Sequence, residues 1–311
     1  MPTPCTVTLL SALQLRGVGP VAARRVAAQL AHNLKAGGEP LALSELGFSK
    51  THSAAELADA RANAERLIEK CISKSIEIFS ILDEQYPRRL AQIGDAPPIV
   101  YVKGSPKSLN ILGCAVVGTR EASSYGLKIA HKISSMCADR HFNVISGLAL
   151  GIDTAAHEGA LSNNGVTLAI MAHGLDVIAP SSNKKLAERI IETGGALLSE
   201  HEPGVPPRPP EFVRRNRIQS GIAVCSIIVE SGEKGGSIHQ ARFTHAQGRP
   251  VLAVLPEGGP PDFRSDGGRL LVREYGARPM HSSDQVISTV QALVEEELKH
   301  RSTSTQAELG V

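Results

Sequence analysis

The stretch Cys114-Ala115-Val116-Val117-Gly118-Thr119-Arg120-Glu121-Ala122-Ser123 joins a short apolar run to a polar loop that contains glycine and arginine. Similar apolar runs recur along the chain, and stretches with a helical pattern separate them. We expect strands at 114–117, 142–145, 166–170, 222–229 and 251–254, and helices at 125–139, 153–163, 184–193 and 240–247. Continuous apolar runs indicate strands that are buried on both faces, as in a parallel sheet covered by helices. The sequence therefore predicts an α/β fold with an extended Rossmann-like, doubly wound and mostly parallel sheet, whose ligands lie beyond the carboxyl ends of the strands.

The segment that precedes this sheet is expected to form a small helical domain. A leucine-rich stretch leads to Gly17-Val18-Gly19-Pro20, and an alanine-rich stretch follows. This turn is typical of a helical hairpin, and it resembles a helix-hairpin-helix (SAM-like) unit. Such a unit can offer free amides to a phosphate, although the same turn also serves ordinary helix packing. We divide the chain into a helical domain at 1–75, a Rossmann-like domain at 76–290, and a helix end with a tail at 291–311, loose after about Leu298.

The composition indicates a globular protein whose positive charge is local rather than general. Of the 311 residues, 42% are hydrophobic, which suffices for a sizeable core, and the formal net charge is only +2. Aromatic residues make up 3% of the chain and Trp is absent, which disfavours a surface that grips many bases by stacking. Any contact with nucleic acid must therefore depend on charged side chains and backbone amides.

The cysteines and the N-terminal residues indicate whether the chain binds a metal and where in the cell it is located. The five cysteines form no C-x-x-C pair and show no metal-ligand spacing with the histidines, so we expect reduced thiols, no metal and no cofactor. The start Met1-Pro2-Thr3-Pro4 lacks the features of a signal peptide, and no stretch approaches the roughly 20 apolar residues that span a bilayer. We expect a cytoplasmic protein without membrane contact.

The first strand-to-helix loop offers groups that can hold a phosphate. Gly118 lets the backbone approach an anion, Arg120 can donate two parallel hydrogen bonds, and Ser123 can cap the following helix. A dinucleotide site would require G-x-G-x-x-G here, and that pattern is missing. A plain loop with an exposed arginine explains the same residues equally well.

The next loop contains Gly147 and leads to a helix that carries Asp153 and His157 on one face. Glycines before a helix supply free amides, and Asp153 can cap the helix or orient a basic neighbour. An Asp and His pair at this spacing can suggest catalysis. A structural hydrogen bond is the better explanation, because no nucleophile stands beside the pair.

Two further segments add positive charge. Asn183 is expected to cap a helix whose first turn carries Lys184 and Lys185, and such lysines oppose the helix dipole unless a bound anion or solvent compensates them. The run Arg214-Arg215-Asn216-Arg217 would repel itself without anions. The turn Lys234-Gly235-Gly236-Ser237 then opens another helix and is a candidate anion nest.

Taken together, these loops resemble the DprA/Smf family. The resemblance covers the chain from the N-terminal hairpin to about residue 290, and it rests on Val117-Gly118-Thr119-Arg120, Ser146-Gly147-Leu148-Ala149, Gly174-Leu175-Asp176, Leu198-Ser199-Glu200 and Arg215-Asn216-Arg217. Several ordered motifs are more specific than one glycine-rich loop. The chain departs from the family pattern at Ala179 and Val213, but neither change removes a basic residue.

The resemblance implies a Rossmann-like domain that binds single-stranded DNA, forms a homodimer and assists RecA loading during natural transformation or recombination. It implies no catalytic residue. The predicted DNA- and phosphate-binding residues, from the loops and the resemblance together, are Gly118, Arg120, Ser123, Gly147, Asn183, Lys184, Lys185, Arg215, Asn216, Arg217, Gly236 and Ser237.

Two other functions remain open at this point. Nucleotide phosphoribohydrolases of the LOG type share this Rossmann variety and carry a catalytic Glu after a glycine-rich loop, but no Glu follows Gly235-Gly236-Ser237-Ile238-His239-Gln240. The other is an interaction module of a mobile-element or defence system whose phosphate loops hold a small nucleotide. Affinity that rises with oligonucleotide length would argue against such a module.

Overall fold

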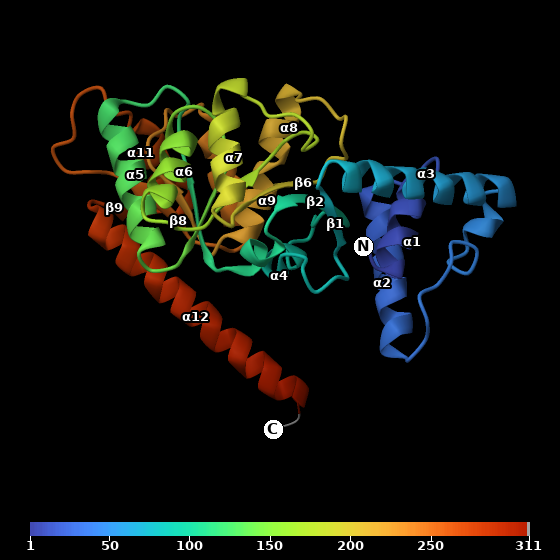
Figure 1. Ribbon diagram of the computed structural model, residues 1–311. Coiled ribbons are helices and arrows are strands. Elements are labelled where there is room, and N and C mark those ends of the chain that lie inside the picture. Colours follow the sequence, from blue (N-terminus) through green and yellow to red (C-terminus); the bar gives the residue numbers. More distant parts are fainter. Residues whose placement is uncertain (310–311) are drawn as a thin grey trace.

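A mixed sheet forms the centre of the molecule (Figure 1). The computed structural model describes the backbone of residues 1–309 and the side chains of residues 1–302. Within that part of the chain the strand order is β1-β2-β6-β5-β4-β3-β7-β8-β9. The strands are β1 Glu77–Ser80, β2 Ile99–Gly104, β3 Gly113–Val117, β4 Asn143–Ser146, β5 Thr167–Ile170, β6 Ala196–Ser199, β7 Ser226–Ile228, β8 Val251–Val254 and β9 Arg278–Met280.

Most of the sheet is parallel, and its connections change direction at β3. This strand pairs in parallel with both β4 and β7. The chain passes from β3 through β4 and β5 to β6 on one side, and it later adds β7, β8 and β9 on the other. β1 and β2 are antiparallel additions at one edge. The predicted fold class is therefore confirmed, and a topological switch point, the usual ligand site of such sheets, lies beside β3.

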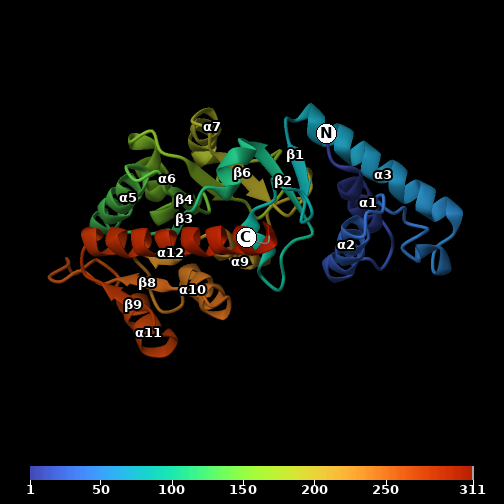
Figure 2. The ribbon, with the colours of Figure 1, turned by 90° about the horizontal axis from the view of Figure 1, so that it is seen from below.

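The sequence of β3 shows why helices must cover both faces of the sheet. Cys114 and Val116 pack in a core with α5 Ser124–Ala138, α6 Ile152–Ser162 and α12 Ser283–Leu309. Ala115 and Val117 point to the opposite face, where α9 Asn216–Ile222 and α10 Gly236–Ala246 pack. Because successive strand residues alternate between faces, a strand buried on both sides has to be apolar throughout. Figure 2, seen from below, shows α12 lying across this part of the molecule.

Outside the N-terminal region, four further helices are short connections or outer elements. They are α4 Arg88–Ala91, α7 Lys184–Glu192, α8 Pro209–Arg214 and α11 Asp266–Tyr275, with 3₁₀ turns at η1 Phe48–Lys50, η2 Pro106–Asn110 and η3 Ser181–Asn183.

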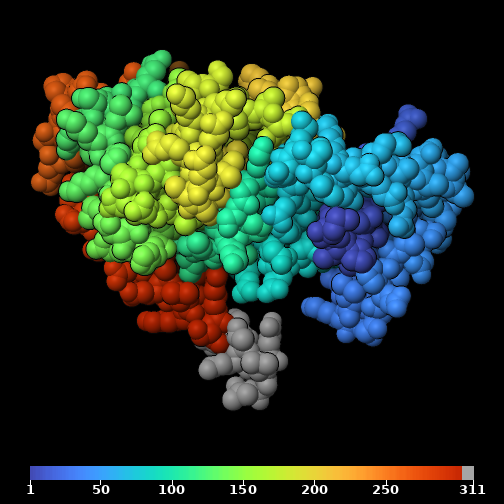
Figure 3. Space-filling model, viewed as in Figure 1, coloured from blue at the N-terminus to red at the C-terminus, as the bar shows by residue number. Residues whose placement is uncertain are grey.

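The N-terminal region is helical, as predicted, and forms a lobe beside the sheet (Figure 3). It contains α1 Pro4–Leu13, α2 Pro20–Lys35 and α3 Ala54–Ser73. Ser53 and Glu56 form a reciprocal capping box at the start of α3. Buried residues of these helices share one core with Tyr101 of β2 and Leu197 of β6. The lobe is thus packed on the sheet edge, and the predicted boundaries at 75 and 290 stay predictions.

Two of the predicted elements are wrong. The strand expected at 222–229 is confined to β7, because residues 216–222 form α9 and Ile222 is its last residue. The tail expected to be loose after Leu298 continues as α12 to Leu309. Within the described residues, no helix is both long and apolar enough to cross a membrane.

Candidate functional site

A cavity of about 520 Å³ lies at the carboxyl edge of the sheet, beside β3 and β7. Its walls come from the loop after β3, from α8 and α9, and from the first turn of α10. The position agrees with the switch-point rule for open α/β sheets. Of the predicted site residues, the fold brings six together here: Gly118, Arg120, Arg215, Asn216, Gly236 and Ser237.

Arg120 lies at the cavity as an exposed cation. Its guanidinium carbon lies 5.4 Å from the centre of the Phe212 ring, which α8 supplies. This contact holds the side chain by a cation–π interaction rather than by an ion pair. The guanidinium therefore keeps donors that an incoming phosphate can use.

Arg215 forms part of the cavity wall, but only 5% of the residue is exposed. Its Nη1 donates to the Ile170 carbonyl at 2.6 Å. A Cβ added at Gly147 would lie 1.9 Å from that nitrogen, so glycine is required for the guanidinium to pack there. Burial, reinforced by the charge of Arg120 and opposed by Asp153, lowers the pKa of Arg215 to about 10. The side chain remains a cation at neutral pH.

Arg217 does not line the cavity. Only 4% of it is exposed, and its guanidinium pairs with Glu200 at 2.6 Å and with Asp95 at 3.1 Å. The expectation that the arginine run needs outside anions is thereby corrected for Arg217, because the carboxylates of Glu200 and Asp95 already pair with it. Arg214 is the exposed member of the run.

Ser123 caps α5, as predicted, but its other polar groups are occupied. Its hydroxyl donates to Glu230 Oε2 at 2.9 Å and its amide to the same oxygen at 3.1 Å. Glu230 is 1% exposed, and Gly126 is required beside it because an added Cβ would lie 1.9 Å from Oε2. A protein carboxylate thus fills the amino end of α5, which is where an anion would otherwise bind.

Lys184 and Lys185 are exposed in the first turn of α7, at the same edge of the sheet but outside the cavity. Asn183 stands at the capping position, yet its side chain makes no cap bond. Its amide instead donates to the Leu148 carbonyl and to the Thr154 hydroxyl, each at 2.9 Å. Asn183 therefore fixes the neighbouring loop, and within the part of the chain whose side chains are described, neither lysine forms an ion pair.

Asp153 and His157 lie one turn apart on α6, but each bonds to other partners. Asp153 accepts from the amides of Gly147 and Ala149, and burial raises the pKa of its carboxyl although Arg215 opposes the shift. His157 Nδ1 lies 2.7 Å from the Thr167 hydroxyl. Asp153 and His157 therefore do not bond to each other, and each is held by hydrogen bonds to other groups of the fold.

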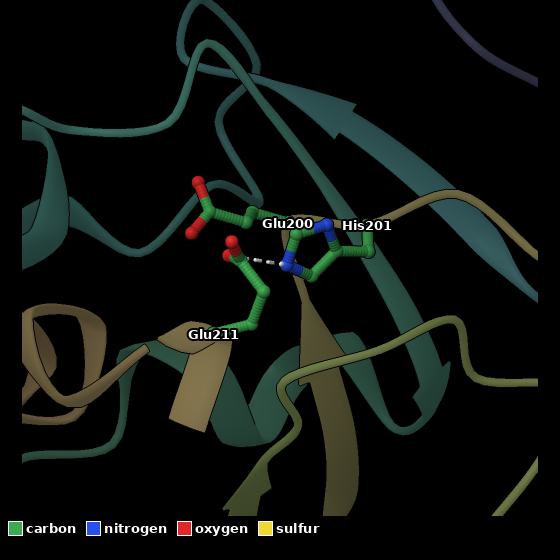
Figure 4. A group of neighbouring side chains, drawn as sticks. All are labelled: Glu200, His201 and Glu211. Atoms are coloured by element: carbon green, nitrogen blue, oxygen red, sulfur yellow. Dashed lines mark ion pairs between the residues drawn. The ribbon is translucent and has the colours of Figure 1, made fainter. Parts of the chain in front are cut away.

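A group of possible metal ligands lies on the outer side of α8 (Figure 4). Glu200, His201 and Glu211 each offer one ligand atom within 4.8 Å of the others. Figure 4 shows the Glu211 carboxylate between the other two groups. His201 pairs with Glu211 at 3.2 Å, and Glu200 is already engaged with Arg217. These contacts join α8 to the end of β6, and the one between His201 and Glu211 is an ion pair only while the imidazole is protonated.

Sequence reasoning missed three residues of this region. Phe212 and Gln219 line the cavity, and Glu230 fills the amino end of α5. Glu230 had a detectable signal, since it is a carboxylate placed directly after a buried strand. Phe212 and Gln219 had none, because their helices, α8 and α9, were not predicted.

Comparisons with known proteins agree with the motif pattern. Residues 77–291 match the family described as DNA recombination-mediator protein A. The chain is 39% identical to the DNA processing protein DprA of Streptococcus pneumoniae over 210 residues, which are 68% of this chain and 73% of the relative. It is 37% identical to the protein Smf of Escherichia coli K12 over 208 residues, 67% of this chain, and it spans 55% of that longer protein.

Solved structures give the same result over more of the chain. The X-ray structure of DprA from Streptococcus pneumoniae matches with a TM-score of 0.72 and 32% identity, covering 92% of this chain and 97% of that one. The structure of DprA from Helicobacter pylori, described as giving insight into a single-stranded DNA binding mode, matches with a TM-score of 0.62 and 27% identity over 70% of this chain and 96% of that one. The protein described here therefore belongs to the DNA recombination-mediator protein A family, the family of DprA and Smf.

Proposed function

We propose that the chain binds single-stranded DNA through its phosphate backbone, along the carboxyl edge of the sheet. The observation that carries the proposal is the exposure of Arg120 at the switch point, with Lys184 and Lys185 exposed at the same edge. Family membership supports it, because the Helicobacter pylori relative is described by its single-stranded DNA binding mode. Contacts to phosphates carry no base information, so we expect little sequence preference.

We also propose that the site binds its ligand without transforming it. The buried carboxylate in the cavity, Asp153, is held by two backbone amides. Glu230, the other buried carboxylate nearby, is committed to the amino end of α5. We expect no release of free base when the protein is incubated with a nucleoside monophosphate. Homodimer formation and RecA loading follow from the family resemblance and belong to the same proposal.

Salt-dependent binding of labelled poly-dT tests the DNA site. Counterion release makes the logarithm of the binding constant fall linearly with the logarithm of salt concentration, by about 0.7 per phosphate contact on single strands. Arg120→Ala should therefore reduce the slope by about 0.7 and weaken binding at low salt. The matched control is Arg273→Ala, which removes an exposed arginine from the last turn of α11.

An unchanged slope in both Arg120→Ala and Lys184→Ala would overturn this assignment. Arg217→Ala separates the structural from the binding role of the arginine run. Since Arg217 is buried against Glu200, its loss should lower the free energy of unfolding and leave the salt slope of the folded protein close to that of the wild type.

A further inference from the structure

Two elements bring three side chains that can ligate a metal to one point beside α8 (Figure 4). Glu200 and His201 follow β6, and Glu211 belongs to the first turn of α8. The backbone bends at Glu200 and His201. Consecutive side chains, which point to opposite sides of a straight strand, can therefore meet on one side here. One ligand atom of each of the three residues lies within 4.8 Å of the others.

The loop that separates these side chains is held in place by the rest of the fold. The His201 amide donates to the Ser199 hydroxyl at 3.0 Å, which fixes the bend after β6. Further along the loop, Lys70 of α3 donates to the Pro203 carbonyl at 2.6 Å. The protein therefore positions the three side chains by contacts of its own, and a ligand that binds there meets groups that are already ordered.

Glu200 carries a buried carboxylate oxygen without a partner. Its side chain is only 10% exposed. Oε2 accepts from Arg217 at 2.6 Å, whereas Oε1 accepts from no group in the described chain. A bare buried acceptor is costly, so in native proteins it generally meets a ligand, an ion or an ordered water. Glu200 thus resembles a metal-binding carboxylate, in which one oxygen meets the ion and an outer partner holds the other.

His201 and Glu211 have the spacing of two ligands of one ion. His201 Nε2 lies 3.2 Å from Glu211 Oε2, yet that oxygen accepts no hydrogen bond from any described residue. Two ligands of a tetrahedral Zn²⁺ ion, each about 2.0–2.2 Å from the metal, lie about 3.3–3.5 Å apart. The side chain of Glu211 is 22% exposed, which gives its carboxylate room to turn and close the wider separation from Glu200.

The charges of this cluster favour a bound cation. Glu200, Glu211 and Asp95 bring three carboxylates, and Arg217 is the one permanent cation among the groups that these contacts join. A proton on His201 would give Glu211 a partner but would leave Glu200 Oε1 bare. A divalent ion between the three ligand atoms would meet both bare oxygens at once, and so would offset the cost of burying them.

We propose that Glu200, His201 and Glu211 bind one Zn²⁺ ion. An imidazole nitrogen with two carboxylate oxygens suits Zn²⁺, whereas Mg²⁺ and Ca²⁺ prefer oxygen ligands alone. Three protein ligands leave the fourth tetrahedral position to water or to an exogenous ligand. The expectation of no metal rests on cysteine spacing, which cannot detect a site made of two carboxylates and one imidazole.

A bound ion would join the end of β6 to α8. Phe212, the neighbour of Glu211 in α8, contacts Arg120 and lines the cavity beside β3 and β7. Fixing α8 would therefore also fix one wall of that cavity. The metal site does not depend on the proposed DNA binding, because neither Arg120 nor the lysines of α7 are among its ligands.

Calorimetric titration of the full chain, first treated with EDTA and then dialysed, tests the proposal. Zn²⁺ should bind with one ion per chain, and Mg²⁺ should bind much more weakly. His201→Asn removes the imidazole, and Glu211→Gln keeps the size of the side chain but removes its charge. Loss of an outer partner alone weakens metal binding about ten- to a hundredfold, so loss of either ligand should weaken Zn²⁺ binding at least about a hundredfold.

The matched controls are His32→Asn and Glu274→Gln, at exposed positions of α2 and α11. Both should bind Zn²⁺ as the wild type does. Hydrogen exchange of the wild-type chain locates the ion even if a ligand variant does not fold. With free Zn²⁺ at about a hundred times its Kd, the amides of α8 should exchange up to about a hundredfold more slowly than in EDTA, since opening of α8 must release the ion.

Three results would overturn the site. The first is the absence of Zn²⁺ binding. The second is binding that is equally tight in the wild type and in both ligand variants, or that leaves the exchange of α8 unchanged, because the ion would then lie elsewhere. The third is Mg²⁺ binding as tight as that of Zn²⁺, which would show that the imidazole is not a ligand. Titration of the EDTA-treated chain with poly-dT tests the proposed function separately, whichever of these results is found.

Discussion

At the scale of single residues, the arginines of the run 214–217 show how position outweighs composition. Arg215 packs on Gly147, and Arg217 pairs with Glu200 and Asp95. The sequence shows three cations in four positions, and the fold exposes Arg214 while burying the other two. The carboxylates that pair with Arg217 come from other loops, Asp95 before β2 and Glu200 after β6, so local reasoning could not find them.

His157 carries a residue-scale prediction about pH. The Thr167 hydroxyl donates to the Val144 carbonyl, so it must accept from His157 Nδ1, and Nε2 is the bare, buried nitrogen. Burial, with the charge of Arg215 acting in the same direction, lowers the pKa of His157 from 6.5 to about 3. As pH falls below 6.5, the unfolded chain binds a proton that folded His157 does not bind until about pH 3. His157 therefore does not reduce the free energy of unfolding above pH 6.5, and it reduces that free energy progressively as the pH falls toward 3.

Urea unfolding at pH 7 and pH 5 measures this effect. Over that interval His157 should remove on the order of 2 kcal/mol from the free energy of unfolding. His157→Asn, whose amide can donate to Thr167, should flatten the dependence without abolishing it, because burial also lowers the pKa of His173. His32→Asn, at an exposed position, should keep the full wild-type slope. The same slope in His157→Asn and in the wild type would contradict the assignment.

At the scale of elements, the sequence predicts the adjacent strands β5, β4, β3, β7 and β8 and the helices α5, α6, α7 and α10 that follow them, but not the outer strands β1, β6 and β9 or the helices α8 and α9 beside the cavity. β3 could be read from its sequence because a strand buried on both faces is apolar throughout. α8 and α9 were missed for two reasons. α8 is only six residues long and follows a proline-rich loop, and α9 is a short buried helix, which periodicity alone cannot separate from a buried strand. The sequence therefore predicts that the glycine-bearing loops and Arg120 lie at the carboxyl edge of the sheet, and they do. The cavity wall that carries Phe212 and Gln219 is recognisable only in the tertiary structure.

The anchoring of α8 gives an element-scale prediction. His201 pairs with Glu211 at 3.2 Å, and the adjacent residue of α8, Phe212, holds Arg120. Glu211→Gln removes the charge of this pair, so α8 should open more often. Its amides should exchange with solvent up to about fivefold faster, the effect of a partly exposed ion pair. Hydrogen exchange followed by mass spectrometry measures this change.

The matched control is Glu274→Gln, which removes an exposed carboxylate at the far end of α11. It should leave the exchange of α8 unchanged. If α8 exchanges at the wild-type rate in Glu211→Gln as well, the cluster of Glu200, His201 and Glu211 does not anchor the helix.

At the scale of the whole molecule, the N-terminal lobe and the sheet edge are one packed unit. Leu9 of α1 is fully buried in a core that also contains Tyr101 and Leu197 of the sheet. Arg24 of α2 donates to the Ala96 carbonyl just before β2. At the opposite end of the chain, Glu297 of α12 pairs with Arg89 of α4. These contacts join the N-terminal lobe to the segment that leads into β2, and α12 to α4.

This shared core predicts that the lobe and the sheet unfold together. Leu9→Ala should lower the free energy of unfolding by about 2–5 kcal/mol, and it should shift one common thermal transition in calorimetry. Val21→Ala, at an exposed position of α2, is the control and should have little effect. A separate early transition, shifted by Leu9→Ala alone, would instead show that residues 1–75 unfold as an independent domain.

The contact between Arg120 and Phe212 has a practical consequence, because the chain contains no Trp. A Phe212→Trp variant would carry a single indole, placed beside the guanidinium that we expect a phosphate to engage. Its emission could be excited selectively and would report on the cavity itself rather than on the protein as a whole. Stopped-flow fluorescence of that variant would therefore time the arrival of a strand at the site, without a dye on either partner.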